Sequence, residues 1–378
     1  MTMAAETTEI RVPFLDLWAI HGDLKAELLE SFSELIDSGA FINGPAVHEF
    51  EQAFAAYVGT SSAIGLASGL DALRLGLLGA GLQPGDEVIV PANTFVATLE
   101  AVTQAGGRPV PVEMSETDWN IDVEAVEAAI GEKTRFLMPV HLYGQMADMR
   151  ALTALAEARG LVLAEDACQA HGAERDGIRA GVNGTFSAFS FYPGKNLGAF
   201  GDAGALTTND VELAAAAKSL REHGQRAKYE HEREGWTARL DTIQAIVLLA
   251  KLQRLDGWND ERREIAAHYL ERLDGVGDLE LPPVAGDSAP VWHLFVVRTA
   301  DPTALADFLR ARGIATGRHY PDPPHLTEAY RWLGYETGSF PLAERHAVRC
   351  LSLPIFPGMT IDDAEAVVAA VSAFFDGG

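Results

Sequence analysis

Short apolar runs alternate with amphipathic stretches through the first two thirds of this chain. The runs have strand character and occupy residues 63–66, 87–90, 135–140, 160–164 and 186–191. The stretches between them space their apolar residues by three and four, as helices do, at 70–78, 123–130, 149–159 and 211–221. Because successive parallel strands need a crossover between them, this alternation predicts βαβ units and an α/β fold.

Two of these runs indicate where the sheet lies. Residues 136–138 and 161–164 are apolar at every position, so both faces of these strands must be buried. A strand buried on both faces belongs to a parallel sheet that carries a helix layer on each side. We therefore expect a three-layer αβα unit with a mostly parallel sheet, in which ligands bind beyond the carboxyl ends of the strands.

The last third of the chain shows a different pattern of predicted helices, strands and loops. Residues 241–259 read as one long amphipathic helix, and we place a hinge near its end. Beyond it come a strand candidate at 291–297, a helix at 303–312 and a proline-dense loop at 320–325. This pattern predicts two domains, a large one over 1–258 that includes the N-terminal segment and a smaller α+β domain over 259–378.

Charge and cysteine content exclude several classes of partner. The chain has 54 acidic and 29 basic side chains, a net charge of −25, which argues against nucleic acid and acidic membranes. No apolar run is long enough to span a bilayer, and Met1 to Arg11 lack the apolar core of a secretory signal. Cys168 and Cys350 form no disulfide framework, and the histidines show no metal-ligand spacing. We expect a cytoplasmic protein without a metal site.

The most informative segments are 165–171 and 190–202. Asp166 closes an apolar run, and Lys195 follows 29 residues later in a Pro-Gly turn. Taken singly, the acid could be a helix cap and the lysine a solvated loop cation. Together they suit a cofactor that needs a lysine for a Schiff base and an acid that keeps its ring nitrogen protonated. That cofactor is pyridoxal phosphate.

These segments and several others resemble the sugar aminotransferases of the DegT/DnrJ/EryC1/StrS group, which are fold type I pyridoxal-phosphate enzymes. The resemblance runs from about Val12 to near the C-terminus. Besides the two segments above, its motifs lie at 13–17, 41–45, 91–95, 141–145, 239–241 and 351–354. The resemblance implies transfer of an amino group from L-glutamate to a nucleotide-linked keto sugar, in a ping-pong cycle through pyridoxamine phosphate. It also implies a homodimer whose active sites lie at the subunit interface.

The resemblance assigns roles at the cofactor. Lys195 becomes the Schiff-base lysine, which also moves a proton, so its pKa must be lowered by burial or by a neighbouring cation. Asp166 pairs with the ring nitrogen, and Gln169 lies near the phenolic oxygen. Phe95 stacks on the ring of the cofactor. Without the motif, a phenylalanine at this position would be expected to be a buried core residue. Ser190 binds the phosphate, although alone it would read as an ordinary strand-end serine.

Two positions depart from the pattern of the group. Gly69 and Leu70 open a helix whose free N–H groups suit a phosphate, but relatives carry threonine where this chain has Leu70. Backbone amides must therefore replace a hydroxyl contact. Thr237 stands where relatives usually have an asparagine that reaches the phosphate in the neighbouring subunit. A shorter threonine puts that contact in doubt.

The motifs most resemble enzymes that aminate C3 of thymidine-diphosphate 3-keto-6-deoxyhexoses, with a 4-keto sugar or a keto-cyclitol as alternatives. His319, Tyr320, His325 and His223 are the candidate substrate residues, although loop histidines are more often surface residues. A dehydratase of the same fold would carry histidine in place of Lys195. A non-catalytic regulator would need a DNA-binding element. The sequence shows no such motif, and its net negative charge opposes contact with DNA.

Overall fold

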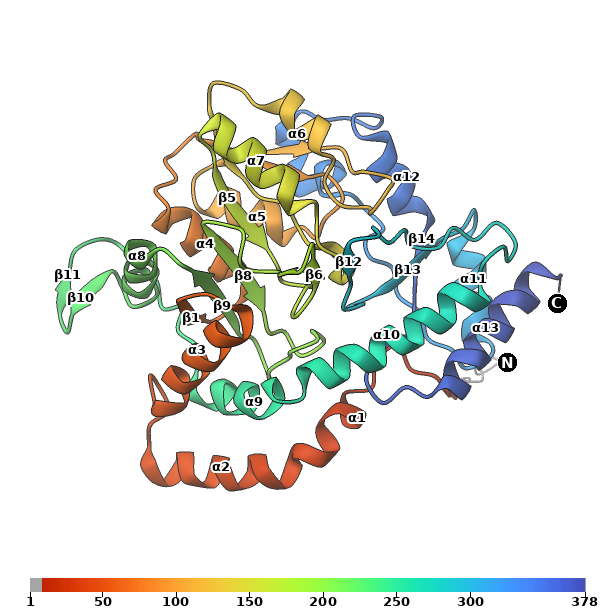
Figure 1. Ribbon diagram of the computed structural model, residues 1–378, viewed down its shortest axis with the longest axis horizontal. Helices are drawn as coiled ribbons and strands as arrows, with labels where there is room; N and C mark the ends of the chain where they lie inside the picture. Colours follow the sequence, from red (N-terminus) through yellow and green to blue (C-terminus); the bar gives the residue numbers. More distant parts are fainter. Residues whose placement is uncertain (1–8, 378) are drawn as a thin grey trace, which may run out of the picture.

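The computed structural model describes residues 9–377 and is built around a seven-stranded sheet (Figure 1). In spatial order its strands are β1 (Ser62–Leu66), β9 (Gly204–Thr208), β8 (Phe186–Ser190), β5 (Val162–Asp166), β4 (Thr134–Leu137), β2 (Glu87–Pro91) and β3 (Arg108–Val112). Strand β9 is antiparallel to both of its neighbours, and the other pairs are parallel. The predicted α/β class with a mostly parallel sheet is confirmed. Most of the segment 1–11, which the sequence predicts not to be a secretory signal, lies outside the described residues.

Two strands of this sheet, β3 and β9, were not predicted from the sequence patterns. Strand β3 contains Pro109 and Pro111, which remove two backbone donors. Strand β3 lies at the edge of the sheet and pairs only with β2. No strand on its other side needs backbone donors, so the two prolines are tolerated there. Strand β9 ends in two threonines and lacks a continuous apolar run, yet both threonines are buried between β8 and β1.

Helices cover both faces of the sheet and form two separate cores. One face packs against α3 (Pro45–Val58), α6 (Val123–Ala129), α7 (Met149–Arg159) and α9 (Thr242–Leu252). The other packs against α4 (Gly69–Gly79), α5 (Ala97–Gln104) and α8 (Val211–Arg221). The strands alternate between these cores: Ile89 belongs to the first, and its neighbours Val88 and Val90 belong to the second. This is the three-layer arrangement expected from the sequence.

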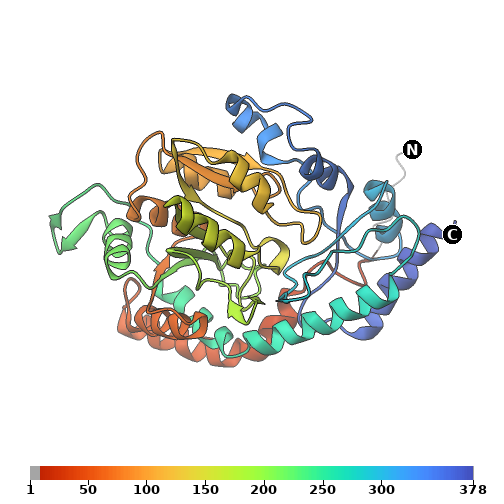
Figure 2. The same cartoon turned by 45° about the horizontal axis from the view of Figure 1, so that its top comes forward.

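The long helix expected at 241–259 is two helices. Helix α9 ends at Leu252, and α10 (Leu255–Arg272) begins after a break at residues 253–254. The break lets α9 bury its apolar face against α3 and α2 (Lys25–Ser38), while α10 runs on to the C-terminal part of the chain (Figure 2). The domain boundary that we predict after residue 258 therefore falls within the first turn of α10.

The C-terminal part has its own core. It contains β13 (Phe295–Arg298) paired antiparallel with β14 (Cys350–Leu353), together with α11 (Pro302–Arg310), α12 (Pro341–Arg349) and α13 (Ile361–Phe375). Val12 forms a parallel bridge with Ile314 and packs in this same core. The N-terminal segment thus contacts the C-terminal unit, although we had grouped it with the large domain. Sequence patterns cannot show this contact because it joins residues about three hundred positions apart.

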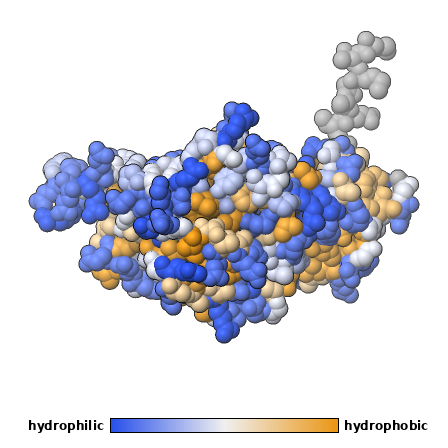
Figure 3. All heavy atoms as spheres, turned by 90° about the horizontal axis from the view of Figure 1, so that it is seen from above, coloured by the Kyte–Doolittle hydropathy of each residue, from blue (hydrophilic) through white to orange (hydrophobic). Residues whose placement is uncertain are grey.

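The remaining elements are short. They are α1 (Leu17–His21), β6 (Glu174–Arg175), β7 (Ile178–Arg179), β10 (Gln225–Ala227), β11 (Glu230–His231), β12 (Ser288–Ala289) and 3₁₀ turns at Gly22–Leu24, Leu142–Gly144, Pro324–Leu326 and Glu328–Leu333. The β10–β11 hairpin projects from the body of the molecule (Figure 1), and Figure 3 shows that this projection is hydrophilic. None of the helices within residues 9–377 has the length and hydropathy needed to cross a bilayer.

Candidate active site

A cavity of about 540 Å³ gathers most of the residues that the sequence singled out. The predicted residues that line it are Gly69, Leu70, Phe95, Asp166, Gln169, Ser190, Lys195, His319 and Tyr320. Asp166 is the last residue of β5 and Ser190 the last of β8, and these strands are parallel neighbours. The cavity therefore opens at the carboxyl ends of the parallel strands, where α/β sheets bind their ligands.

The carboxylate of Asp166 is fixed by two hydrogen bonds. Its Oδ2 accepts from the hydroxyl of Thr98 at 2.9 Å, and its Oδ1 accepts from the backbone N–H of Cys168 at 3.2 Å. The residue is only 5% exposed, and the exposed part faces the cavity. A buried carboxylate held in this way is positioned to pair with a cationic ring nitrogen.

Lys195 lies in the loop that follows β8. Its backbone N–H donates to the carbonyl of Tyr192 at 2.8 Å, which closes the Pro-Gly turn expected from the sequence. Burial lowers the pKa of Lys195, while Cys168 and Asp166 oppose that shift. A lysine with a lowered pKa has a larger fraction of neutral amine, which is the form that attacks a carbonyl carbon.

The first turn of α4 forms an anion site beside Ser190. The hydroxyl oxygen of Ser68 accepts from the N–H of Asp71, and the first helical bond joins the N–H of Ala72 to the carbonyl of Ser68. The N–H groups of Gly69 and Leu70 therefore have no acceptor within the helix. A Cβ on Gly69 would lie 2.7 Å from Cβ of Ser190, so glycine is required for the serine to come this close.

Aromatic and amide side chains form another part of the cavity lining. The ring of Phe95 is about half exposed, and its centroid lies 5.1 Å from that of Tyr320. The Nε2 of Gln169 donates to the hydroxyl of Tyr320 at 3.1 Å, and its Oε1 accepts from the N–H of Tyr143 at 2.8 Å. These bonds hold Gln169 and Tyr320 in place across 151 residues of sequence.

His319 also lines the cavity and is held from two sides. Its ring stacks on Phe14 with centroids 5.6 Å apart, and its Nδ1 lies 2.7 Å from the hydroxyl of Ser352. Burial, with a smaller contribution from the charge of Lys195, lowers the pKa of His319 to about 4. His319 is therefore neutral at neutral pH.

Comparison with known proteins decides the family. The model of the DegT/DnrJ/EryC1/StrS aminotransferase family matches residues 22–372. The chain belongs to this family. It is 50% identical, over 98% of its length and 97% of the relative's, to the dTDP-3-amino-3,4,6-trideoxy-α-D-glucose transaminase of Streptomyces venezuelae. The predicted family and the predicted aminotransferase class are confirmed.

Solved structures of similar proteins agree with this assignment. A crystal structure of S. venezuelae DesV in complex with a ketimine intermediate superimposes with a TM-score of 0.95 at 49% identity, covering 98% of this chain and 99% of that one. A crystal structure of NtdA from Bacillus subtilis with bound cofactor PMP gives a TM-score of 0.90 at 31% identity, covering 99% and 87%. The family fold is therefore shared over the whole described chain.

Three predicted site residues lie away from the cavity of their own chain. His325 is buried elsewhere, with its Nε2 3.2 Å from a carboxylate oxygen of Glu344 and its ring against Phe340. His223 precedes the projecting β10–β11 hairpin, and its Nε2 lies 3.0 Å from the hydroxyl of Thr237. The structure thus pairs His223 with Thr237 and does not bring either of them to Lys195.

Several cavity residues were not singled out as site residues from the sequence, among them Arg262 and His293. Arg262 lies on α10 and His293 precedes β13, and both line the cavity. Arg262 reads from the sequence as one of several charges on an amphipathic helix. His293 was hidden in the apolar run 291–297, where its polar ring is the only interruption that could have marked it.

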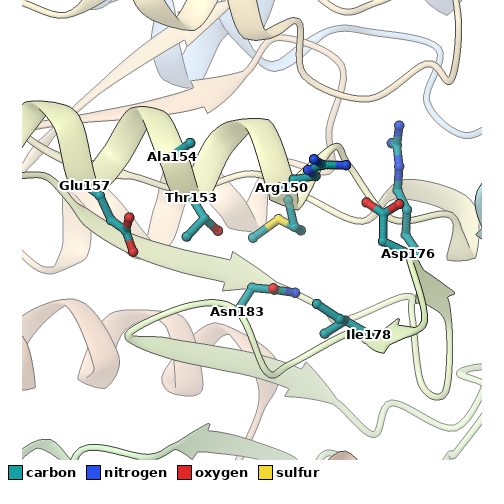
Figure 4. A pocket seen from close by; sticks show the side chains of 9 residues that line it. Arg150, Thr153, Ala154, Glu157, Asp176, Ile178 and Asn183 are labelled. Carbon is teal, nitrogen blue, oxygen red and sulfur yellow. The ribbon is translucent and has the colours of Figure 1, made fainter.

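A second cavity, of about 290 Å³, lies between α7 and the β6–β7 hairpin (Figure 4). Arg150 and Thr153 of α7 face Asp176 and Ile178 of the hairpin across it. None of the predicted site residues lines this cavity. Within residues 9–377 no cluster of three histidine, cysteine, aspartate or glutamate side chains has the arrangement of a metal site.

Proposed function

We propose that this chain transfers an amino group from L-glutamate to a nucleotide-linked keto sugar, a dTDP-3-keto-6-deoxyhexose, in two half-reactions through pyridoxamine phosphate. The sugar-aminotransferase activity and the pyridoxal-phosphate cofactor expected from the sequence are confirmed by the family match and its relatives. The observation that carries the proposal is the single cavity that places Lys195 and Asp166 beside the free N–H groups of α4. A 4-keto sugar or a keto-cyclitol is the alternative acceptor.

The residues present fit this cofactor. The N–H groups of Gly69 and Leu70 and the hydroxyl of Ser190 would hold the phosphate at the positive end of the α4 dipole. Asp166 would hold the ring nitrogen. Phe95 would cover one face of the ring, since its own ring is exposed into the cavity. When bound, pyridoxal phosphate supplies an aldehyde and an electron-accepting ring.

The side chains around the cofactor would each have a separate role. Asp166 would face the ring nitrogen, and the hydrogen bonds that Thr98 and the N–H of Cys168 donate to its carboxylate fix its position. Lys195 provides the amine that holds the cofactor and, when released, accepts and returns a proton at Nζ. Gln169 and Tyr320 line the same cavity, and the 3.1 Å hydrogen bond between them fixes both side chains.

We assign the substrate contacts to His319 and Tyr320, because both line the cavity next to Lys195. A neutral imidazole and a phenol are hydrogen-bonding groups that suit the hydroxyls of a sugar. His325 does not reach the cavity, and its bond to Glu344 is the contact that the structure gives it. His223 and Thr237 would act only from a partner subunit.

A homodimer is part of the proposal. Phe95 and Tyr192 line the cavity and are 49% and 59% exposed, and Phe200 on the same loop as Tyr192 is 44% exposed. Exposed large aromatic side chains at and near this cavity are what an interface would cover. The hydrophilic β10–β11 hairpin projects from the body of the molecule (Figures 1 and 3), and the exposed residues His223 and Thr237 beside it would reach a second copy.

Two further assignments complete the proposal. We divide the chain near residue 258 into a large and a small domain, since Leu255 packs in a core of the sheet and Ile265 packs in the C-terminal core. We place the protein in the cytoplasm, where the thiols of Cys168 and Cys350 would stay reduced.

An absorption spectrum of the purified protein, before and after addition of L-glutamate, tests the proposal. We expect a visible band from pyridoxal phosphate bound to Lys195, which glutamate converts to the spectrum of the pyridoxamine form. Addition of dTDP-linked keto sugars should then restore the first spectrum. A protein that gains no band after reconstitution with pyridoxal phosphate would contradict the assignment, and restoration only by a 4-keto sugar or a keto-cyclitol would change the acceptor.

A further inference from the structure

A closed circuit of hydrogen bonds joins the strand-end loops of the sheet to the C-terminal part of the chain. The backbone N–H of Tyr143 donates to Oε1 of Gln169 at 2.8 Å, and Nε2 of Gln169 donates to the hydroxyl of Tyr320 at 3.1 Å. The hydroxyl of Tyr143 donates in turn to the carbonyl of His319 at 2.5 Å. Because His319 and Tyr320 are neighbours in the chain, the circuit begins and ends at Tyr143.

Tyr143 differs from the other three members of this circuit in its position. Gln169, His319 and Tyr320 line the cavity that contains Lys195, whereas Tyr143 is only 7% exposed and lies behind them in a buried cluster. A residue in this position does not touch a ligand in the cavity. Any effect of its hydroxyl on the reaction must therefore pass through the side chains that it holds.

The hydrogens of this cluster fit one arrangement. A carbonyl oxygen can only accept, so the hydrogen of the Tyr143 hydroxyl lies on its bond to His319. Nε2 of His346 lies 3.0 Å from the same hydroxyl and must then donate to it, while Nδ1 of His346 has no partner. Burial lowers the pKa of His346 to about 3, so this imidazole is neutral and carries its one hydrogen on Nε2.

The backbone of Tyr143 indicates that its side chain is required. Its φ of 60° and ψ of 7° lie in the left-handed region, which bulky residues rarely adopt and glycine adopts without strain. Strained backbone of this kind persists where the surrounding contacts fix it, and it is concentrated at functional sites. A glycine here would relieve the strain but would lose the bond to the carbonyl of His319.

We propose that Tyr143 is a positioning residue for the sugar half-reaction, whose hydroxyl fixes the backbone of His319 and so holds the His319 and Tyr320 side chains at the cavity. This inference rests on the proposed function, which assigns the sugar contacts to those two side chains. Lys195 and Asp166 are not members of the circuit. The half-reaction with L-glutamate should therefore depend on the Tyr143 hydroxyl much less than the half-reaction with the keto sugar.

Tyr143→Phe is the direct test, because it removes one oxygen and leaves the backbone bond to Gln169 in place. We expect KM for a dTDP-3-keto-6-deoxyhexose to rise about tenfold, since the carbonyl of His319 loses its donor, while the single-turnover rate with L-glutamate stays within about twofold of the parent. An unchanged KM for the keto sugar, or equal losses in both half-reactions, would overturn the proposal.

Tyr269→Phe is the matched control. Tyr269 is also buried, and its hydroxyl also donates to a backbone carbonyl, that of Pro354 at 3.0 Å, but it lies in the C-terminal core and does not line the cavity. The same oxygen is removed, so a general loss of stability would affect both variants. We expect the parental KM for the keto sugar in Tyr269→Phe, and a rise equal to that of Tyr143→Phe would overturn the proposal.

A double-variant comparison tests whether Tyr143 acts through the circuit. Tyr320→Phe opens the circuit at its bond to Gln169 and removes one of the two side chains that Tyr143 holds for the sugar. Tyr143→Phe should therefore raise KM by a smaller factor in the Tyr320→Phe background than in the parent. An equal factor in the two backgrounds would show independent effects and would overturn the proposal.

Hydrogen–deuterium exchange of the holoenzyme without substrates gives a measurement that does not depend on turnover. Peptides that span residues 316–322 should exchange about fivefold faster in Tyr143→Phe and at the parental rate in Tyr269→Phe. Parental exchange in Tyr143→Phe would overturn the proposal. If that variant does not fold, the imidazole ¹⁵N shifts of His346 in the parent should show a protonated Nε2, and a deprotonated Nε2 would overturn the hydrogen-bond arrangement on which the proposal stands.

These measurements separate the inference from the function on which it rests. Faster exchange in Tyr143→Phe, combined with no transfer to any keto sugar by the parent, would overturn the proposed acceptor, while the hold of Tyr143 on the His319 segment would stand. Transfer to the keto sugar with parental KM in Tyr143→Phe would overturn the positioning role and leave the proposed function standing.

Discussion

Asn196 donates a hydrogen bond from its Nδ2 to the Oδ1 of Asn259, 2.9 Å away, and so joins the residue next to Lys195 to helix α10. The orientation of both amides is fixed by backbone carbonyls, which can only accept. Nδ2 of Asn259 donates to the carbonyl of His171, and Nδ2 of Asn196 also donates to the carbonyl of Val291. The Oδ1 of Asn196 must therefore face the Nδ1 of His293, 3.2 Å away. That nitrogen carries the hydrogen, and the Nε2 of His293 is left with a lone pair.

His293 should therefore be a neutral Nδ1–H tautomer throughout the range near neutral pH. Burial first, and then the charges of Lys195 and Arg262, lower its pKa well below the usual value for histidine. Imidazole ¹⁵N shifts of the parent, assigned with His293→Asn, should show a protonated Nδ1 from pH 8 down to pH 6. A protonated Nε2, or a titration midpoint near 6.5, would contradict the hydrogen-bond network.

Replacement of Lys195 by alanine or arginine should abolish both the visible absorption of the bound cofactor and amino transfer. Alanine removes the nitrogen that holds the cofactor, and arginine keeps a cation but cannot form the imine. Absorption spectra and single-turnover assays with L-glutamate provide the measurement. Retained turnover in either variant would remove Lys195 from the mechanism, and a normal circular dichroism spectrum would show that the fold is intact.

Asp166→Asn should lower turnover by several orders of magnitude and leave the fold intact, because an amide cannot keep the ring nitrogen protonated. Thr98→Val is a milder variant for comparison. It keeps the shape of the side chain and removes only the 2.9 Å hydrogen bond to the Asp166 carboxylate, so a much smaller loss is expected. Half-reaction rates with L-glutamate measure both effects. Near-parental rates in Asp166→Asn would exclude the assigned role.

The buried ring of His171 should make the protein sensitive to acid. It lies between Phe189 and Phe191, with centroids 5.4 and 5.7 Å away, and burial, then the charge of Lys195, lowers its pKa to about 3. An unfolded histidine titrates near 6.5, so between about pH 6.5 and 3 the unfolded chain binds more protons than the folded one. This group's contribution to stability is therefore lost progressively as the pH falls through that window.

His171→Phe should reduce this acid sensitivity, since phenylalanine fills a similar volume between the two rings and does not titrate. Urea unfolding midpoints at pH 5 and at pH 8 give the comparison, and the difference between the two midpoints should be smaller in the variant than in the parent. The pH 8 midpoint serves as the internal control, because the histidine is neutral there in both folded and unfolded chains. Equal differences in the two proteins would refute the prediction.

Phe200→Glu should weaken the homodimer that we propose. The side chain is 44% exposed beside the cavity, so a charge there is tolerated in the monomer and penalised under a partner subunit. Val348→Glu on α12 is the matched control, because Val348 is 62% exposed and belongs to the C-terminal unit. Light scattering should give at least a dimer for the parent and for Val348→Glu, with dissociation in Phe200→Glu. A stable, active monomer of the parent would contradict a shared site.

The sequence by itself determined the class of fold and the centre of the chemistry. Strands such as β5 and β8 are short apolar runs that bury both faces, and such runs are recognisable because burial is a local demand on side-chain type. The Asp166 and Lys195 motifs were readable because the chemistry they serve requires particular residue types at each position. Gly69 was named from its motif at a helix start, and the structure supplies the further reason that a Cβ there would lie 2.7 Å from Cβ of Ser190.

Only the tertiary structure decided which polar residues meet at the cavity. It joined Gln169 to Tyr320 and Asn196 to His293, separated His325 from the site, and packed Val12 against the C-terminal core. It also left Arg262 buried and unpaired on the cavity wall, where the sequence shows only a charge on an amphipathic helix. These relationships depend on distances between segments far apart in the chain, and periodicity and composition report only on near neighbours.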